Sequence, residues 1–345
     1  MIFKKLGRFV VGHPWWVIGA WVIGAVVLLT LSPQLVKYTS NNNSSFLPSS
    51  YGSVQAQQVA AKYFPASAGA TGTIVVSADD HDALSTADQQ KTAGLAAALT
   101  ADHIPSVVTV TTSPLYLSQD KKVQLVQVVF DGQPGATGPN AAVPIVRDKT
   151  NAYLAGSGLN GGLTGNAAIS VDSTTAFDNA EKIIAIATVV LIVVLLGLVF
   201  RSVLIAVLPI VIIGIVHQMA QALTADLADW FGFIVGPELA PLLVVVMFGV
   251  GTDYFVFMVF RHRERMAGGD NAKDSLRFSV ERVGEVIASA GATVIAAFAA
   301  LLVASLESLK TLAPGLIAGI ALMLLAALTL IPAILSLLGK HVFWP

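Results

Sequence analysis

An aspartate stands inside an apolar stretch of this chain that is long enough to cross a membrane. Asp253 lies eight residues before Arg261, which corresponds to about 12 Å along an α-helix. An ionisable side chain at that depth is costly and normally faces a bundle interior or a water-filled cavity. Because desolvation disfavours the charged carboxylate, we expect Asp253 to take up and release a proton. The alternative is a structural role, in which Asp253 accepts a hydrogen bond that holds helices together.

Three hydroxyl-bearing residues are candidates to assist this proton transfer. Tyr254 can donate to the Asp253 carboxylate or accept from the protonated acid. Neighbouring residues on a helix point about 100° apart, however, so each of the two needs a partner on another helix. Ser289 and Thr293 are four residues apart and share a helical face. They could pass a proton toward Asp253 through water, or they could only promote helix packing.

Other residues near this site have structural interpretations. Gly249 and Gly251 flank the aspartate, and small residues permit close approach of membrane helices. His217 lies within another apolar stretch and could titrate, although a structural histidine with satisfied hydrogen bonds is the simpler interpretation.

The composition of the chain indicates the class of protein to which these residues belong. The 345-residue chain is 55% hydrophobic and only 12% charged, with a mean hydropathy of +0.74. Soluble domains carry about 25% charged residues, so the chain is predicted to be an integral membrane protein. The net charge of −1 gives no indication of nucleic-acid binding, and the absence of cysteine excludes disulfides, thiol catalysis and thiolate metal sites. No nucleophile–base arrangement, metal site or cofactor motif is evident, so an enzyme is not expected.

Six apolar segments are long enough to span a bilayer, which takes roughly 20 residues as a helix. They cover residues 14–36, 181–200, 203–223, 239–260, 284–306 and 313–338. The pattern predicts a first domain of residues 1–36 with one span and a bundle of five spans in 181–345. Residues 37–180 form a polar domain between them.

The positive-inside rule predicts the orientation of these spans. Basic residues gather in the N-terminal segment and in the connector 261–283, whereas residues 224–238 contain no Lys or Arg. Both termini are therefore expected in the cytoplasm and residues 37–180 outside a cell membrane. Within the connector, an amphipathic helix from about residue 271 is expected to lie on the cytoplasmic surface.

The polar domain is predicted to be an α+β domain that follows a linker and a short helix. Strands are expected at 71–80, 107–118, 123–132 and 161–170, with helices at 85–101 and 141–155 and a flexible turn at 131–140. This βαββαβ order suits a ferredoxin-like fold.

The acids of the polar domain gather near the end of its first predicted strand. They are Asp79, Asp80, Asp82 and Asp88. Such a group could bind a cation, but a solvated loop is the favoured interpretation.

The stretch "FGVGTDYFVFMVFRHRER" (248–265) resembles the fourth-span signature of the MmpL/YdfJ-type branch of the RND transporter superfamily. "GNAAISVDSTTAFDNAEKI" (165–183), "FLPSSYGSVQAQQVAAKYFP" (46–65) and "ASAGATVIAAFAALL" (288–302) are also similar to this branch. The resemblance implies proton-driven export of lipids or other hydrophobic molecules. It implies that Asp253 and Tyr254 form the proton relay, with Ser289 and Thr293 as weaker candidates.

The chain departs from this family in one respect, because such transporters usually have twelve spans in two homologous halves. We expect either a truncated half or a half-size transporter that pairs with a second copy. In a homodimer, a two-fold axis would set Asp253 of each copy against Tyr254 of the other. The alternatives are an accessory subunit similar to the SecD/SecF helpers and a lipid-sensing scaffold without transport of its own.

Overall fold

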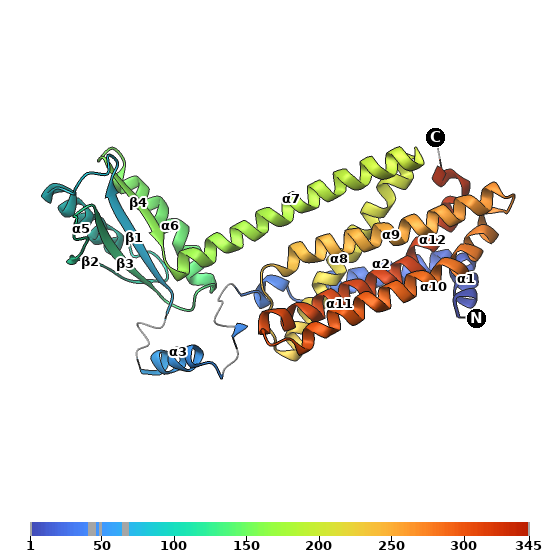
Figure 1. Cartoon of the computed structure of the whole chain (residues 1–345), viewed down its shortest axis with the longest axis horizontal. Helices are drawn as coiled ribbons and strands as arrows, with labels where there is room; N and C mark the ends of the chain where they lie inside the picture. The colour runs from blue at the N-terminus through green and yellow to red at the C-terminus, as the bar shows by residue number, and fades with distance from the viewer. Residues whose placement is uncertain (1, 41–45, 48–49, 64–68, 344–345) are drawn as a thin grey trace. The chain divides into compact units, whose positions relative to one another are not determined.

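The computed structural model describes residues 2–40, 46–47, 50–63 and 69–343, and part of the expected linker falls outside these ranges. The chain divides into two compact units (Figure 1). One unit, here called the bundle, comprises residues 1–39 and 177–345, and the other, the sheet unit, comprises residues 40–176.

The six predicted spans are confirmed as six long apolar helical segments within the described residues. They are α2 (Pro14–Leu31), α7 (Asn166–Phe200), α8 (Val203–Phe231), α9 (Leu239–Ala267), α10 (Ala272–Ala299) and α11 (Glu307–Leu328). A 3₁₀ turn, η3 (Ala300–Val303), extends α10, and α12 (Leu330–Leu338) continues α11 beyond a break at Thr329. The break precedes Pro332, which has no N–H to donate to the preceding turn.

Short helices precede and follow the spans. The sequence patterns did not predict α1 (Ile2–Gly12), which packs against α10. Gly7 makes this packing close, because a Cβ at Gly7 would lie 3.2 Å from Cβ of Val280. The 3₁₀ turns η1 (Leu35–Tyr38) and η4 (Gly339–Phe343) follow α2 and α12.

Several helices run further than the apolar segments that predicted them. The α8 helix continues to Phe231 and ends at Gly232, whose φ of 68° is in the left-handed region. The α9 helix continues to Ala267, and α10 begins after Asn271, whose side chain accepts a hydrogen bond from the Asp274 N–H. The helix expected on the membrane surface from about residue 271 is therefore the first part of α10.

The sheet unit contains one four-stranded antiparallel sheet in the order β2-β3-β1-β4. Its elements are β1 (Thr71–Ala78), α5 (Thr86–Ala101), β2 (Val107–Leu117), β3 (Val123–Phe130), α6 (Thr137–Leu154) and β4 (Leu159–Thr164). A separate helix, α3 (Gly52–Tyr63), precedes β1. The structure thus contains the predicted helices and strands in their predicted order.

Alternating apolar residues bury one face of the central strands, as the pattern "QLVQVVF" predicts. Ile74 of β1 pairs with Val126 of β3, and both side chains are fully buried. Leu95 of α5 and Val143 of α6 belong to the same core. One face of the sheet is therefore covered by the two helices.

The prediction of a last strand at 161–170 is wrong over its second half. Gly165 adopts a φ of 104°, a conformation that favours glycine and ends the strand. Asn166 then begins α7, and its Oδ1 accepts a 2.6 Å hydrogen bond from the Thr71 N–H. The flexible turn expected at 131–140 is likewise shorter, because α6 begins at Thr137.

Candidate functional site

The α9 helix carries the Asp253 site and packs closely against two other helices at Gly251. A Cβ at this position would lie 2.8 Å from Sδ of Met323 in α11 and 2.9 Å from Ile213 in α8. Real Cβ atoms do not come so close, so a side chain at residue 251 would require the Met323 and Ile213 side chains to shift. Gly249 differs, because a Cβ there would meet no described heavy atom within 4 Å. Gly251 therefore lies at a helix contact within the chain, whereas Gly249 lies on a free surface.

Tyr254 is the buried member of the Asp–Tyr pair. Its side chain is only 4% exposed, and its hydroxyl has no hydrogen-bond partner among the described residues. The hydroxyl points at the α10 backbone, where a Cβ on Gly291 would lie 3.0 Å from Tyr254 Oη. The Tyr254 hydroxyl therefore packs tightly against the α10 backbone at a residue that has no side chain. Gly291 was not predicted as a site residue from the sequence, although it lies between Ser289 and Thr293.

Asp253 is exposed on the surface of the bundle. We expected it to face a bundle interior or cavity, and within this chain it does neither. No described residue forms a hydrogen bond or ion pair with its carboxylate. Asp253 and Tyr254 diverge, as the 100° rotation between neighbouring helical residues predicts. The buried Tyr254 hydroxyl and the Thr252 hydroxyl, which also has no described partner, flank this carboxylate in sequence.

Ser289 and Thr293 also lie on the exposed surface. The Thr293 hydroxyl donates a 2.9 Å hydrogen bond to the Ser289 carbonyl within α10. Because Tyr254 contacts Gly291, between these two residues, Asp253 lies at the same level of the bundle as the Ser289–Thr293 pair. The structure thus brings the predicted relay residues to one level on adjacent helices. Within the described part of the chain, no hydrogen bond joins Asp253 to the hydroxyl of Ser289 or Thr293.

His217 belongs to a separate polar pair inside α8. Its Nε2 lies 2.8 Å from Nε2 of Gln221, one turn further along the helix. The imidazole is buried, and its Nδ1 has no partner among the described residues. The structure connects His217 to Gln221 and to none of the predicted relay residues.

The acids at the end of β1 form local turn structure. Asp88 completes a capping box with Ser85 at the start of α5, and Asp80 accepts a 3.0 Å hydrogen bond from the Asp82 N–H. Within the described ranges, no group of three or more potential ligands could hold a metal ion. The hydrogen bonds of Asp80 and Asp88 are typical of a solvated loop that leads into a helix.

A polar junction that the sequence patterns did not predict joins the segment after α2 to the end of α8. Ser32 donates a 2.7 Å hydrogen bond to Asp226, and Tyr38 donates a 2.6 Å hydrogen bond to Asp229. The Asp229 carboxylate raises the pKa of the Tyr38 phenol through this bond. Val235 N–H donates to the Tyr38 carbonyl at 2.8 Å. The signal in the sequence was the spacing of two acids, three residues apart, beyond the apolar part of α8.

The family of the chain follows from comparison with known sequences. The model of the MMPL family matches residues 45–345, which is most of the chain. The chain belongs to the MMPL family. The expected resemblance is thereby confirmed, and the chain is a multi-pass membrane protein.

Curated relatives of this MMPL protein are longer. It is 32% identical over 336 residues to the membrane protein SCO5905 of Streptomyces coelicolor, covering 95% of this chain and 39% of that protein. It is 30% identical over 334 residues to the membrane protein ActII-3 of the same organism, covering 96% and 46%. It is 31% identical over 347 residues to the Sulfolipid-1 exporter MmpL8 of Mycobacterium tuberculosis, covering 99% and 32%. The chain thus spans about a third to a half of the length of these relatives.

Proposed function

We propose that this MMPL protein is a proton-motive-force-driven exporter of lipids or other hydrophobic molecules. Membership of the MMPL family and the similarity to the Sulfolipid-1 exporter MmpL8 support the transport of lipids. The secondary active mechanism rests on the residues of α9 and α10 described above.

One observation carries the proton step: the Asp253 carboxylate is exposed on a membrane helix and has no partner among the described residues. A charged carboxylate that faces hydrocarbon is costly, so Asp253 must be protonated or covered by polar groups. Alternation between these two conditions is what a proton-coupled transporter needs. In this proposal Asp253 binds and releases the proton, and the hydroxyls of Tyr254, Ser289 and Thr293 form its route.

A second copy of the chain, or a homologous half, is proposed to cover the Asp253 surface. Gly249 lies one turn from Asp253 and leaves room for a close helix, since no described heavy atom lies within 4 Å of its Cβ position. The sequence-based pairing of Asp253 with Tyr254 of another copy needs revision, because Tyr254 is 4% exposed. Ser289 and Thr293 are already on the surface and need no rearrangement to reach the carboxylate of a partner.

Disulfide cross-linking tests this contact, because the chain contains no natural cysteine. We expect Gly249→Cys to form a disulfide-linked dimer on oxidation in native membranes. A disulfide requires Cα atoms within about 7 Å, which a two-fold contact at Gly249 provides. Val22→Cys, an exposed position on α2, is the matched control and should remain monomeric. Equal cross-linking of the two variants, or none at position 249, would refute the homodimer and leave the proton step standing.

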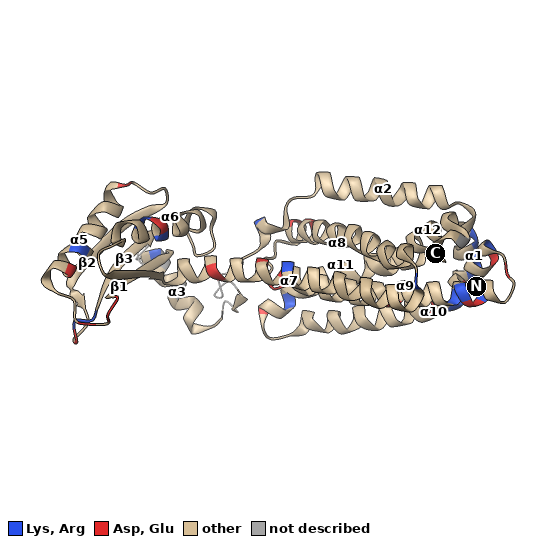
Figure 2. Ribbon diagram, turned by 90° about the horizontal axis from the view of Figure 1, so that it is seen from above, with Lys and Arg blue, Asp and Glu red and all other residues tan. Residues whose placement is uncertain are grey.

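The proposed orientation places both termini in the cytoplasm and the sheet unit outside the cell membrane. Figure 2 shows Lys and Arg gathered at the end of the bundle that carries α1 and the N-terminus. A basic excess of this kind is characteristic of cytoplasmic segments. The sheet order β2-β3-β1-β4, with helices after β1 and β3, supports a ferredoxin-like porter domain for the sheet unit.

A further inference from the structure

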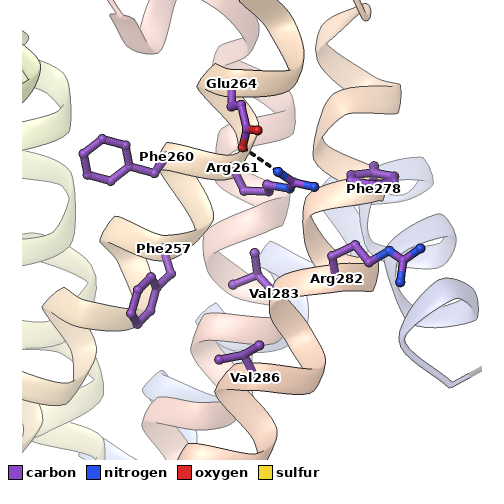
Figure 3. A pocket seen from close by; sticks show the side chains of 8 residues that line it. All are labelled: Phe257, Phe260, Arg261, Glu264, Phe278, Arg282, Val283 and Val286. Carbon is purple, nitrogen blue, oxygen red and sulfur yellow. Dashed lines mark hydrogen bonds and ion pairs between the residues drawn. The ribbon is translucent and has the colours of Figure 1, made fainter. Parts of the chain in front are cut away.

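A pocket with a volume of about 650 Å³ opens between α9 and α10, toward the loop 268–271 that joins them (Figure 3). Its lining comes from both helices and consists of Phe257, Phe260, Arg261, Glu264, Phe278, Arg282, Val283 and Val286. This pocket is separate from the relay residues, because it contains neither Asp253 nor the hydroxyls of α10. No part of the proton step uses it.

The charged side chains of the pocket, Arg261, Glu264 and Arg282, lie toward one end of it, together with the ring of Phe278. Phe257 and Val286 lie furthest from the loop 268–271, and Arg261 and Arg282 lie nearer to it. The loop 268–271 lies at the end of the bundle where Lys and Arg gather, which is the end proposed above to face the cytoplasm (Figure 2). A ligand in this pocket therefore meets hydrocarbon-like walls at one end and guanidinium groups at the other, as a lipid does at a membrane boundary.

The charges of the pocket leave one guanidinium available. Glu264 forms an ion pair with Arg261 at 2.5 Å. Arg265, which lies nearby over the Phe278 ring, is paired with Asp270 at 2.6 Å. Arg282 forms no ion pair or hydrogen bond with any described residue, and its guanidinium lies 5.8 Å from the centroid of Phe278. Two arginines and one glutamate give the pocket a net charge of one positive, which a singly charged anion would balance.

We propose that this pocket binds an anionic phospholipid of the adjacent leaflet. Its phosphodiester carries one negative charge and is held by Arg282, with Arg261 beside it, since guanidinium groups match phosphate oxygens in geometry. One acyl chain follows the apolar wall of Phe257, Val283 and Val286. Free phosphate would gain nothing from that wall, which is why the geometry favours a lipid. The proposal stands on the pocket alone and does not depend on transport.

Native mass spectrometry of the full chain, released from nanodiscs that mix phosphatidylglycerol with phosphatidylcholine, tests this proposal. We expect Arg282→Gln to weaken retention of phosphatidylglycerol about fivefold, the effect of removing one basic side chain near a membrane surface. Arg263→Gln is the matched control, because Arg263 is exposed on the same end of α9 and does not line the pocket. That control should change retention less than twofold. Both variants alter exposed side chains, and retention of phosphatidylcholine checks that each is folded.

Two further measurements separate the contribution of the lipid headgroup from that of its acyl chains. Phe257→Ala should also weaken phosphatidylglycerol retention, because it removes part of the apolar wall. Inorganic phosphate at millimolar concentration should fail to displace the lipid. Equal losses for Arg282→Gln and Arg263→Gln would show a nonspecific charge effect and overturn the proposal. Full displacement by inorganic phosphate, with Phe257→Ala unchanged, would assign the pocket to a free anion instead and would also overturn it.

Discussion

Asp253→Asn is expected to abolish proton-coupled export while leaving the protein folded in the membrane. Asparagine keeps the size and hydrogen-bonding capacity of the side chain but cannot titrate. Because Asp253 is exposed and has no partner among the described residues, the substitution breaks no contact within the chain. We expect transport to fall roughly 100-fold or more, the scale on which losing a proton-transfer group acts in enzymes.

This prediction is measured with the full chain in proteoliposomes, as transfer of a fluorescent lipid driven by an imposed pH gradient. Asp148→Asn is the control, because it makes the same chemical change at an exposed carboxylate in α6 of the sheet unit. It should transport like the wild type. Transport by Asp253→Asn at the wild-type rate, with unchanged dependence on the gradient, would show that Asp253 does not carry the proton.

The second large effect is expected at Gly291, which sequence analysis did not identify. In Gly291→Ala, the added Cβ would lie 3.0 Å from Tyr254 Oη and 3.2 Å from both terminal carbons of Leu324. Overfilling a packed site of this kind costs about 1–3 kcal/mol. Tyr254→Phe alone should change the free energy of unfolding little, because the hydroxyl it removes has no described hydrogen-bond partner. Combined with Gly291→Ala, it should recover part of the lost stability.

A double-mutant cycle measured by equilibrium unfolding in mixed micelles tests this coupling. Favourable coupling between Gly291→Ala and Tyr254→Phe would confirm that the Tyr254 hydroxyl packs against Gly291. Additive effects would contradict the contact. The same Tyr254→Phe protein then tests function separately: because the hydroxyl belongs to the proposed proton route, transport should fall although stability does not.

The spans were predictable because their signal is local. Each apolar segment had to be about as long as the hydrocarbon is thick, and six of them became helices. Their ends were less predictable, because hydropathy reports which residues are apolar enough for the bilayer and not where the helix ends. The α8 helix continues to Phe231, where Gly232 ends it, and α9 continues to Ala267. In the sheet unit, the alternation of β3 predicted its buried face, but the strand ending at Gly165 depends on a backbone conformation that hydropathy does not report.

The arrangement of the candidate residues could not be predicted from the sequence. Helical geometry alone predicts that Asp253 and Tyr254 point apart. Which of them lies inside depends on a contact with a different helix, because Tyr254 fits against Gly291 of α10 and Asp253 is left at the surface. The junction of Tyr38 with Asp229 is also a contact between distant segments, separated by 191 positions in the chain. No pattern within one segment reports such pairs.

The protonation of Asp253 is the central claim, and infrared difference spectroscopy tests it most directly. The full chain in lipid is taken through a pH change, and the carbonyl stretch of protonated carboxylic acids is recorded for the wild type and for Asp253→Asn. We predict a pH-dependent carboxylic acid band in the wild type that is missing in Asp253→Asn and retained in Asp148→Asn. Identical difference spectra for the wild type and Asp253→Asn would contradict the account.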